Sequence, residues 1–241
     1  MILTHSNAGR WDWRFSHNFN VLMSVLTANQ KNILSLLANE AVIADNFYLT
    51  GCTALAELYL NHRLSEDLDF FSEKEIEAKA VSAVLKKIQS KAKIESFRYE
   101  QSFNRNLFFL EIGNDTIKTE FTYFPFTIIE AGEKIEQLRV DSLIDIAVNK
   151  LFTIYQKPRS RDFIDLYCIL EKQKEWTIAN LIDNARAKFD YHIDPLQLAS
   201  QFIKAETLKD YPTMLKKLKQ EIWQRFFMKE ATRLSAEQLE K

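Results

Sequence analysis

The sequence predicts an α+β protein, in which a small mixed sheet flanked by helices is followed by an all-helical C-terminal domain. Residues 94–123 alternate apolar and polar residues as strands do, the segment from Phe47 to Glu73 contains two further strand-like runs, and helical patterns lie between and around them. Pro125 and Gly132 punctuate a linker, after which only helical periodicity continues. The expected division is an N-terminal extension over 1–22, an α+β core over 23–135 and a helical domain over 136–241.

Composition sets limits on the class of protein. At 241 residues, with 27% charged and 46% hydrophobic residues, the chain is long enough to bury a sizeable core. The net charge of −1 argues against nucleic-acid binding by bulk charge, although a local basic patch stays compatible with it. Cys52 and Cys168 have no zinc or disulfide spacing. With no apolar run of membrane-spanning length and no signal peptide, we expect a cytoplasmic protein without a membrane partner.

The N-terminal region divides near Met23. Residues 1–22 show no clear period and are either a dispensable extension from an upstream start or an arm packed by its tryptophans. Thr27 and Gln30 then have the spacing of a capping box, which predicts a helix that begins directly after Thr27.

The segment Phe47 to Glu73, FYLTGCTALAELYLNHRLSEDLDFFSE, has the pattern of a strand, a tight turn, a helix and a second strand. Gly51 ends the first strand and permits close approach of the backbone to a ligand. A helix that begins near Cys52 or Thr53 presents free N–H groups, which suit a phosphate.

Asp67 and Asp69 alternate along the second strand, so they face the same way about 6.6 Å apart. Two such carboxylates repel each other unless a cation lies between them, and Mg²⁺ prefers oxygen ligands of this kind. The structural alternative is a solvated acidic strand end. The turn before the pair favours metal-assisted nucleotide chemistry.

Further elements follow in order. Ser72 and Glu75 have capping-box spacing, which predicts a helix from there to about Ser90. Strands are expected near 94–101, 106–112 and 116–123. On the last of these, Lys118, Glu120 and Thr122 share one face, and the structural interpretation is a surface pair of Lys118 and Glu120.

In the helical part, Ser142 and Asp145 have the spacing of a helix cap, and the predicted helix runs through Tyr155. Lys150 falls inside its apolar stripe. Either its ammonium reaches solvent at the rim, or it binds an anion in the cleft between the domains.

TGCTALAELYLNHRLSEDLDFF resembles the nucleotidyltransferase motif of the AbiEii/AbiGii toxin family, within the polymerase-β-like superfamily. VNKLFTIYQKPRSRDFIDLYCIL resembles its second motif region, so that the likeness covers roughly residues 27–170. Cys52 stands where the family usually has a second Gly or Ser. The matching positions are Gly51, Arg63, Ser65, Asp67, Asp69, Lys150, Arg161, Asp162 and Asp165.

The resemblance implies a Mg²⁺-dependent enzyme that transfers a nucleotide from a nucleoside triphosphate to an acceptor hydroxyl, with RNA such as tRNA as one acceptor. It implies a toxin of an abortive-infection or toxin–antitoxin system, with a cognate antitoxin as partner. One or two Mg²⁺ ions would be held by Asp67, Asp69 and Glu120, and Asp165 would orient Lys150 for catalysis. The nucleotide-binding residues would be Gly51, Cys52, Thr53, Arg63, Ser65, Lys150 and Arg161.

Other interpretations stay open. The same fold would serve an antibiotic-type enzyme that modifies a small molecule, or a non-catalytic protein that binds a partner. Arg161 and Asp165 are also spaced as an intrahelical ion pair. In the C-terminal part, LKKLKQEIWQRFFMKE is either a core-facing stripe with a solvated back or a surface for RNA or a partner.

Overall fold

The computed structural model describes residues 24–239, so the expected extension over 1–22 lies outside the described residues. One sheet has the strand order β3-β4-β5-β2-β1-β7-β6. The pairs β2–β5 and β1–β7 are parallel and the others antiparallel, so the sheet is mixed, as predicted. The strands are β1 (Tyr48–Thr50), β2 (Leu68–Ser72), β3 (Ser96–Ser102), β4 (Arg105–Ile112), β5 (Asp115–Tyr123), β6 (Lys134–Ile135) and β7 (Leu138–Val140).

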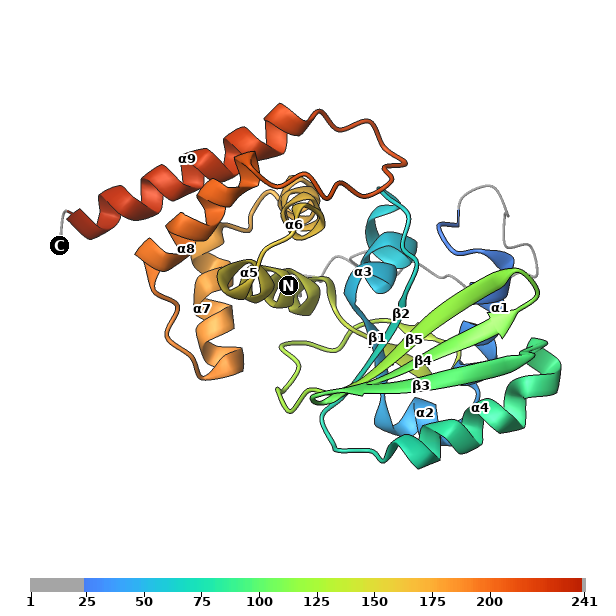
Figure 1. The fold of residues 1–241 in the computed structure, drawn as a ribbon. Helices are drawn as coiled ribbons and strands as arrows, with labels where there is room; N and C mark the ends of the chain where they lie inside the picture. Colours follow the sequence, from blue (N-terminus) through green and yellow to red (C-terminus); the bar gives the residue numbers. More distant parts are fainter. Residues whose placement is uncertain (1–23, 240–241) are drawn as a thin grey trace, which may run out of the picture.

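Helices cover the sheet on the side opposite the helical domain (Figure 1). They are α1 (Ala28–Ala38), α2 (Ala41–Asn46) and α4 (Ala78–Ala92). The aromatic centre of the core lies beneath them, where the rings of Phe70 and Phe121 stack with centroids 4.8 Å apart. Phe108 meets Phe121 edge-on from the next strand, at 5.9 Å. Burial of such rings supplies much of the stability of a domain.

Two predicted helix starts have different outcomes. The Thr27 capping box is confirmed, because its hydroxyl accepts from the Gln30 N–H while the Gln30 side chain accepts from the Thr27 N–H. The cap predicted at Ser72 is wrong, since α4 begins only at Ala78. The Ser72 hydroxyl instead bonds both backbone groups of Lys74, and this bond closes a turn at the end of β2.

The all-helical part begins with α5, which Ser142 caps as predicted. The sheet extends through Val140, so a boundary at residue 135 would divide it, and we propose the boundary after Val140. The remaining helices are α5 (Leu143–Gln156), α6 (Ser160–Lys172), α7 (Ile178–Phe189), α8 (Pro195–Ile203), the short η2 (Lys204–Glu206) and α9 (Gln220–Leu239). None of the helices within residues 24–239 has the length and apolar character needed to cross a membrane.

A buried ion pair joins the linker to two of these helices. The Lys188 ammonium of α7 lies 2.6 Å from Oδ1 of Asp145 in α5, and both side chains are fully buried. Asp145 also accepts hydrogen bonds from the Ser142 hydroxyl and from the backbone N–H groups of Ile129 and Glu130. The pair therefore fixes the linker that forms one side of the space between sheet and helices.

Replacing Lys188 with Ala should destabilise the protein by about 3–5 kcal/mol, because Asp145 would be left as an uncompensated buried charge. Denaturant unfolding measures the change. As a control, Lys174→Ala removes only the surface ion pair with Glu171 and should cost less than about 1 kcal/mol. Equal effects of the two substitutions would contradict a buried role for Lys188.

Candidate active site

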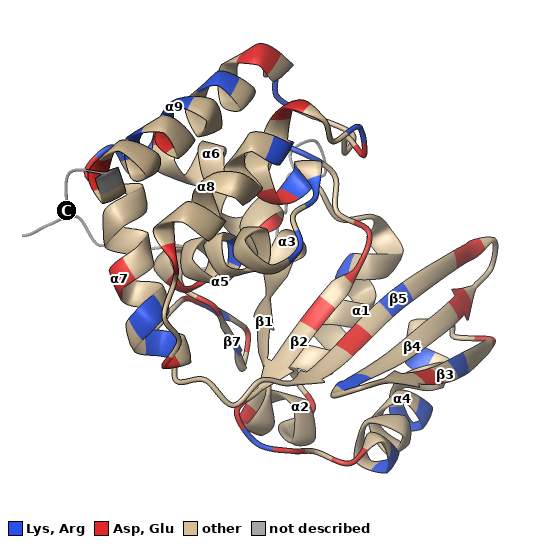
Figure 2. Cartoon of the chain, turned by 60° about the vertical axis from the view of Figure 1, so that its left-hand side comes forward, with Lys and Arg blue, Asp and Glu red and all other residues tan. Residues whose placement is uncertain are grey.

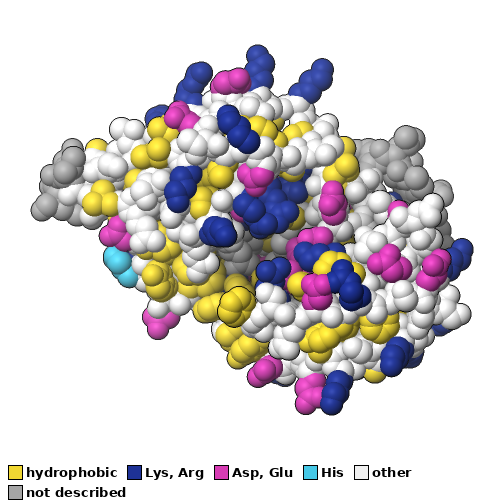
Figure 3. Space-filling view, viewed as in Figure 1, with side chains coloured by type: hydrophobic (Ala, Val, Ile, Leu, Met, Phe, Trp, Pro, Cys, Tyr) yellow, Lys and Arg dark blue, Asp and Glu magenta, His cyan; other side chains and the backbone are white. Residues whose placement is uncertain are grey.

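A cavity of about 900 Å³ lies between the sheet and the helical domain. In the space-filling view the surface is hollowed there, and basic and acidic side chains gather around the hollow (Figure 3). Its sheet wall comes from β1, β2 and β5, and its helical wall from α5 and α6. Charged side chains of opposite sign lie together in it, which makes it the candidate site.

The sheet wall brings the predicted carboxylates together. Parallel pairing of β2 with β5 sets Asp69 directly opposite Glu120, and acidic residues lie side by side on the two strands in Figure 2. Asp67 immediately precedes β2 and also lines the cavity. The predicted convergence of these three side chains on one cavity wall thus agrees with the fold.

Two cations already lie against these carboxylates. The Lys118 ammonium is 2.7 Å from Asp67 Oδ2 and 3.9 Å from Glu120 Oε2. The Arg105 guanidinium donates two hydrogen bonds to the Glu120 carboxylate, of 2.6 and 2.5 Å. Within residues 24–239 no three His, Cys, Asp or Glu side chains form a ready-made metal site. Metal ligation by Asp67, Asp69 and Glu120 therefore remains a proposal.

Asp69 is the electrostatically exceptional member of the group. Burial, and then the charges of Glu120 and Asp67, raise its pKa to about 7. Lys118 opposes this shift without cancelling it. Because burial and neighbouring carboxylates disfavour its ionised form, a cation beside Asp69 would stabilise the charged carboxylate.

Gly51 directly follows β1 and is the first residue of the short helix α3 (Gly51–Ala54), and glycine is required there for two reasons. Its φ of +69° is unfavourable for other residues. A Cβ atom would also lie 2.6 Å from Oδ2 of Asp69. The turn and the carboxylate therefore lie in direct contact. The chain continues from α3 as a π-helix, η1 (Leu55–Leu60), a form that often marks functional sites.

The other predicted phosphate-loop residues divide between the cavity and the interior. Cys52 and Ser65 line the cavity, whereas Thr53 is fully buried and lies outside the lining. The Thr53 hydroxyl bonds the hydroxyl of Ser65 at 2.8 Å and the backbone carbonyl of Asp67. The expected contact between the Thr53 hydroxyl and phosphate is thus not supported. Thr53 instead fixes the segment that carries Asp67.

Asp165 of α6 is the centre of a buried cluster. Arg63 donates to its two oxygens at 2.6 and 2.8 Å, and His62 lies 2.9 Å away. Burial alone would raise the pKa of Asp165, but Lys150 and Arg63 hold it well below its usual range. Since the guanidinium of Arg63 is committed to Asp165 and the Leu64 carbonyl, its predicted role in binding nucleotide is better described as positioning.

Lys150 reaches the cavity wall from α5, and its ammonium lies 2.8 Å from both Asp162 and Asp165. It also donates to the Cys52 sulfur at 3.3 Å. Burial lowers the pKa of Lys150, but these carboxylates outweigh that effect and keep it charged. Asp162 and Asp165 therefore both hold the Lys150 ammonium in place, and the orienting role of Asp165 in catalysis stays a prediction. The alternative in which Lys150 extends to the rim does not fit, because only 6% of the residue is exposed.

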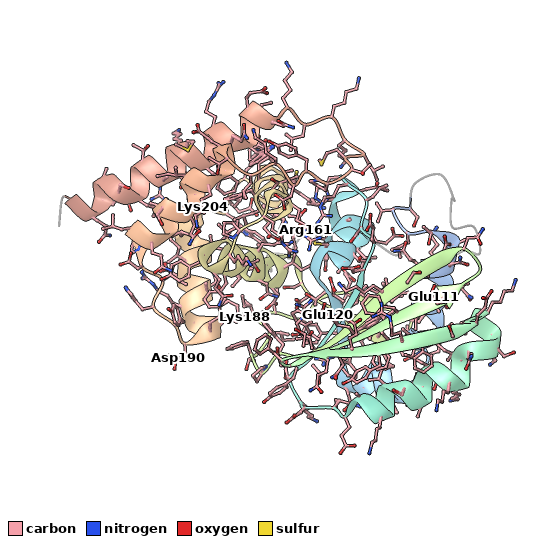
Figure 4. All side chains as sticks on the ribbon, viewed as in Figure 1. Glu111, Glu120, Arg161, Lys188, Asp190 and Lys204 are labelled. Atoms are coloured by element: carbon pink, nitrogen blue, oxygen red, sulfur yellow. The ribbon has the colours of Figure 1, made fainter. Side chains whose placement is uncertain are left out.

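Arg161 lines the helical wall, opposite Glu120 of the sheet wall (Figure 4). Its Nε is buried and has no hydrogen-bond partner within the described part of the chain. The spacing of Arg161 and Asp165 suggested an ion pair within the helix, but the charged partners of Asp165 are Arg63 and Lys150. Arg161 is therefore the cavity cation with most capacity for a ligand.

Sequence reasoning missed several lining residues. Arg105 has no motif of its own. The register of the β4–β5 pair sets it opposite Thr122, on the same face of the sheet as Glu120, to which its guanidinium donates. The cavity end near α5 and α7 is aromatic, where the ring of Phe189 contacts those of Phe126 and Phe152. The signal that the sequence offered for Phe152 was its position within the helix predicted through Tyr155.

Comparisons with known proteins agree with this geometry. A family model described as Nucleotidyl transferase AbiEii toxin, Type IV TA system, matches residues 34–233. An Aquifex aeolicus protein, described as uncharacterized protein aq_aa25, is 31% identical over 153 residues, which cover 61% of this chain and 68% of that protein.

Two solved Helicobacter pylori structures share the fold. JHP933 has 21% identity and a TM-score of 0.55, with 87% of this chain and 91% of that chain covered. A second structure, described as a candidate nucleotidyltransferase, has 20% identity and a TM-score of 0.57, with 88% and 97% covered. At this identity the likeness concerns the fold alone.

Replacing Gly51 with Ala should disrupt the site, because the new Cβ meets Asp69 and the backbone conformation becomes strained. We expect a loss of about 1–3 kcal/mol in unfolding free energy, measured with denaturant. Gly113→Ala is a matched control, since Gly113 also has a positive φ but a Cβ there meets nothing. A cost at Gly51 no larger than at Gly113 would refute the close approach.

The pKa of Asp69 predicts a pH dependence. Because folding raises this pKa from 3.8 to about 7, ionised Asp69 weakens the fold progressively as pH rises through that window. Asp69→Asn should therefore become increasingly stable relative to the unsubstituted protein from about pH 4 to pH 7. Thermal unfolding of both proteins across this range measures the difference. Burial also raises the pKa of Asp141 to about 7. Because Asp141 is present in both proteins, its effect on stability cancels in the difference between them. A constant difference across the range would contradict the raised pKa.

Proposed function

Because the chain belongs to the AbiEii family, nucleotidyltransferase toxins of type IV toxin–antitoxin systems, we propose that it transfers a nucleotide from a nucleoside triphosphate to an acceptor hydroxyl with the help of Mg²⁺. The observation that carries this proposal is the direct opposition of Asp69 and Glu120 beside Gly51. Carboxylates against a glycine turn are the arrangement that couples a cation to phosphate.

The residues present fit a hard divalent cation. Asp67, Asp69 and Glu120 supply carboxylate oxygens, which Mg²⁺ prefers. Burial, and then the charges of Glu120 and Asp67, raise the pKa of Asp69, and a cation beside these groups would oppose that shift. When bound, Mg²⁺ supplies charge neutralisation for the triphosphate and polarisation of the reacting oxygens. Lys118 and Arg105 compensate Asp67 and Glu120, and the side chains of both cations are partly exposed.

The chain's own groups would bind the triphosphate between the two walls. Gly51 and Cys52 would approach it through the backbone, and Arg161 would donate from the helical wall. Lys150 would contribute positive charge while Asp162 and Asp165 hold its ammonium in position. Preorganised charge of this kind costs little reorganisation during reaction.

The partners follow from the family. A toxin of this class implies a nucleoside triphosphate substrate and a cognate antitoxin. We propose an RNA such as tRNA as acceptor. Transfer to a small molecule, as in antibiotic modification, is the competing assignment, and incubation with labelled nucleoside triphosphates and cellular RNA separates the two by where label appears.

Asp69→Asn should abolish nucleotide transfer while the fold stays intact. Asn keeps the shape of the side chain but lacks the negative charge that the cation needs. Transfer of label and the rise in thermal midpoint caused by Mg²⁺ with nucleoside triphosphate should both disappear. Asp183→Asn, on the exposed face of α7, is the control and should keep both. Full transfer by Asp69→Asn would show that the carboxylates do not act as proposed.

A further inference from the structure

Phe103 is the most exposed large apolar side chain of the described residues. It is 94% exposed, whereas Leu196, the next in order, is 52% exposed. It occupies the two-residue turn between β3 and β4, where Ser102 pairs with Arg105. Its φ of +53° is unfavourable for an aromatic residue, and Asn or Gly is the usual choice in such a turn. The sequence thus places an exposed ring where both solvation and backbone energy oppose it.

The turn is held firmly in place. The Asn104 side chain donates to the Tyr123 carbonyl at 2.6 Å, and the Tyr123 N–H donates back to the Asn104 carbonyl at 3.0 Å. Arg105, the next residue, is bound to Glu120 in the cavity. The backbone that carries the Phe103 ring is therefore fixed at the edge of the candidate active site.

Sheet order gives this edge a role. In the order β4-β5-β2-β1, Gly51 follows β1 and Arg105 begins β4, so the two flank the Asp69–Glu120 pair on opposite sides. With the triphosphate at Gly51, the β4 side is left for the acceptor. Asn104 and Arg105 line the cavity, whereas Phe103 lies outside the lining. An acceptor that reaches Phe103 thus extends beyond the cavity.

The charge of the cavity lining limits the kind of acceptor. Its basic residues are Arg63, Arg105, Lys118, Lys150, Arg159 and Arg161. Its acidic residues are Glu66, Asp67, Asp69, Glu120, Asp162 and Asp210. Because the two sets are equal in number, bulk charge attracts no polyanion here. A single-stranded nucleic acid would then gain affinity here by stacking its bases on aromatic rings, which does not depend on a basic surface.

We propose that Phe103 is the stacking platform for a nucleobase of a single-stranded nucleic-acid acceptor, whose terminal hydroxyl enters the cavity. This inference rests on the proposed function and specifies its acceptor. The residues that precede Phe103 on β3, Gln101 and Ser102, are polar, and the exposed aromatic residue of that strand, Tyr99, lies four positions away. Phe103 is thus an isolated ring at the turn. A lone ring among polar groups suits a base, whereas a protein interface needs a larger apolar centre.

The test compares Phe103→Asn, Phe103→Leu and the exposed-residue control Leu196→Ala with the unsubstituted full chain. Binding of labelled short single-stranded RNA and DNA is measured by fluorescence anisotropy, and transfer by label incorporation. Asn fits the backbone of the turn, so Phe103→Asn should unfold at the same or a higher temperature. Both Phe103 variants should raise the Kd for the preferred strand roughly 5- to 100-fold, since neither Asn nor Leu stacks on a base. Leu196→Ala should change nothing.

The rise in thermal midpoint caused by Mg²⁺ with nucleoside triphosphate reports nucleotide binding, which the proposed function requires, independently of the acceptor. It should be equal in all variants. Unchanged strand affinity in Phe103→Asn, or full retention by Phe103→Leu, would overturn the stacking role. Transfer to a small molecule or a protein but not to either strand would overturn the inference and leave the proposed function standing. Absence of both shift and transfer in the unsubstituted protein would overturn the proposed function itself.

Discussion

The parallel pairing of β2 with β5 is the constraint on which the site depends. It places Asp69 opposite Glu120, and the glycine turn after β1 leaves no room for a side chain against Asp69. Carboxylates this close repel one another, and burial strengthens the repulsion. Two features offset this repulsion. Lys118 pairs with Asp67 and Arg105 pairs with Glu120. The stacked rings of Phe70 and Phe121 hold the two strands together on the core side of the sheet.

A second buried charge cluster orders the opposite wall. Asp165 receives Arg63 from the segment before β2 and Lys150 from α5, so it ties the sheet domain to the helices across the cavity. Removing one partner of such a cluster is costly, whereas the complete set gains a fixed geometry. The two walls therefore have different electrostatic states. In the helical wall the Asp165 carboxylate is compensated by Lys150 and Arg63, whereas in the sheet wall burial and the neighbouring carboxylates raise the pKa of Asp69.

Local patterns in the sequence predicted much of this arrangement. Alternation identified the Asp67–Asp69 pair and the strand of Glu120, and capping residues located the helices after Thr27 and Ser142. The Ser72 cap failed because the same spacing also suits a turn at a strand end. Contacts between distant segments were beyond local patterns.

Arg63 and Asp165 illustrate that limit, since 102 positions separate them. Thr53 does so too, because its hydroxyl points inward to the Asp67 carbonyl and away from the cavity. The place of Arg105 beside Glu120 required the register of the β4–β5 hairpin, which no local motif marks. At the β3–β4 turn, Phe103 has a positive φ, a position where Asn or Gly is the usual choice. Where the sequence departs from the residues that best suit a turn, the departure itself marks a candidate functional position.

The central claim is that the sheet wall holds a divalent cation with a nucleotide. A crystal structure with Mn²⁺ and a non-hydrolysable nucleoside triphosphate tests it directly, because Mn²⁺ gives an anomalous signal. We expect an anomalous peak in contact with Asp67 and Asp69, triphosphate oxygens on the same ion, and the Lys118 ammonium moved away from Asp67. Nucleotide bound elsewhere, or bound here with Lys118 still paired to Asp67 and no peak beside it, would contradict the account.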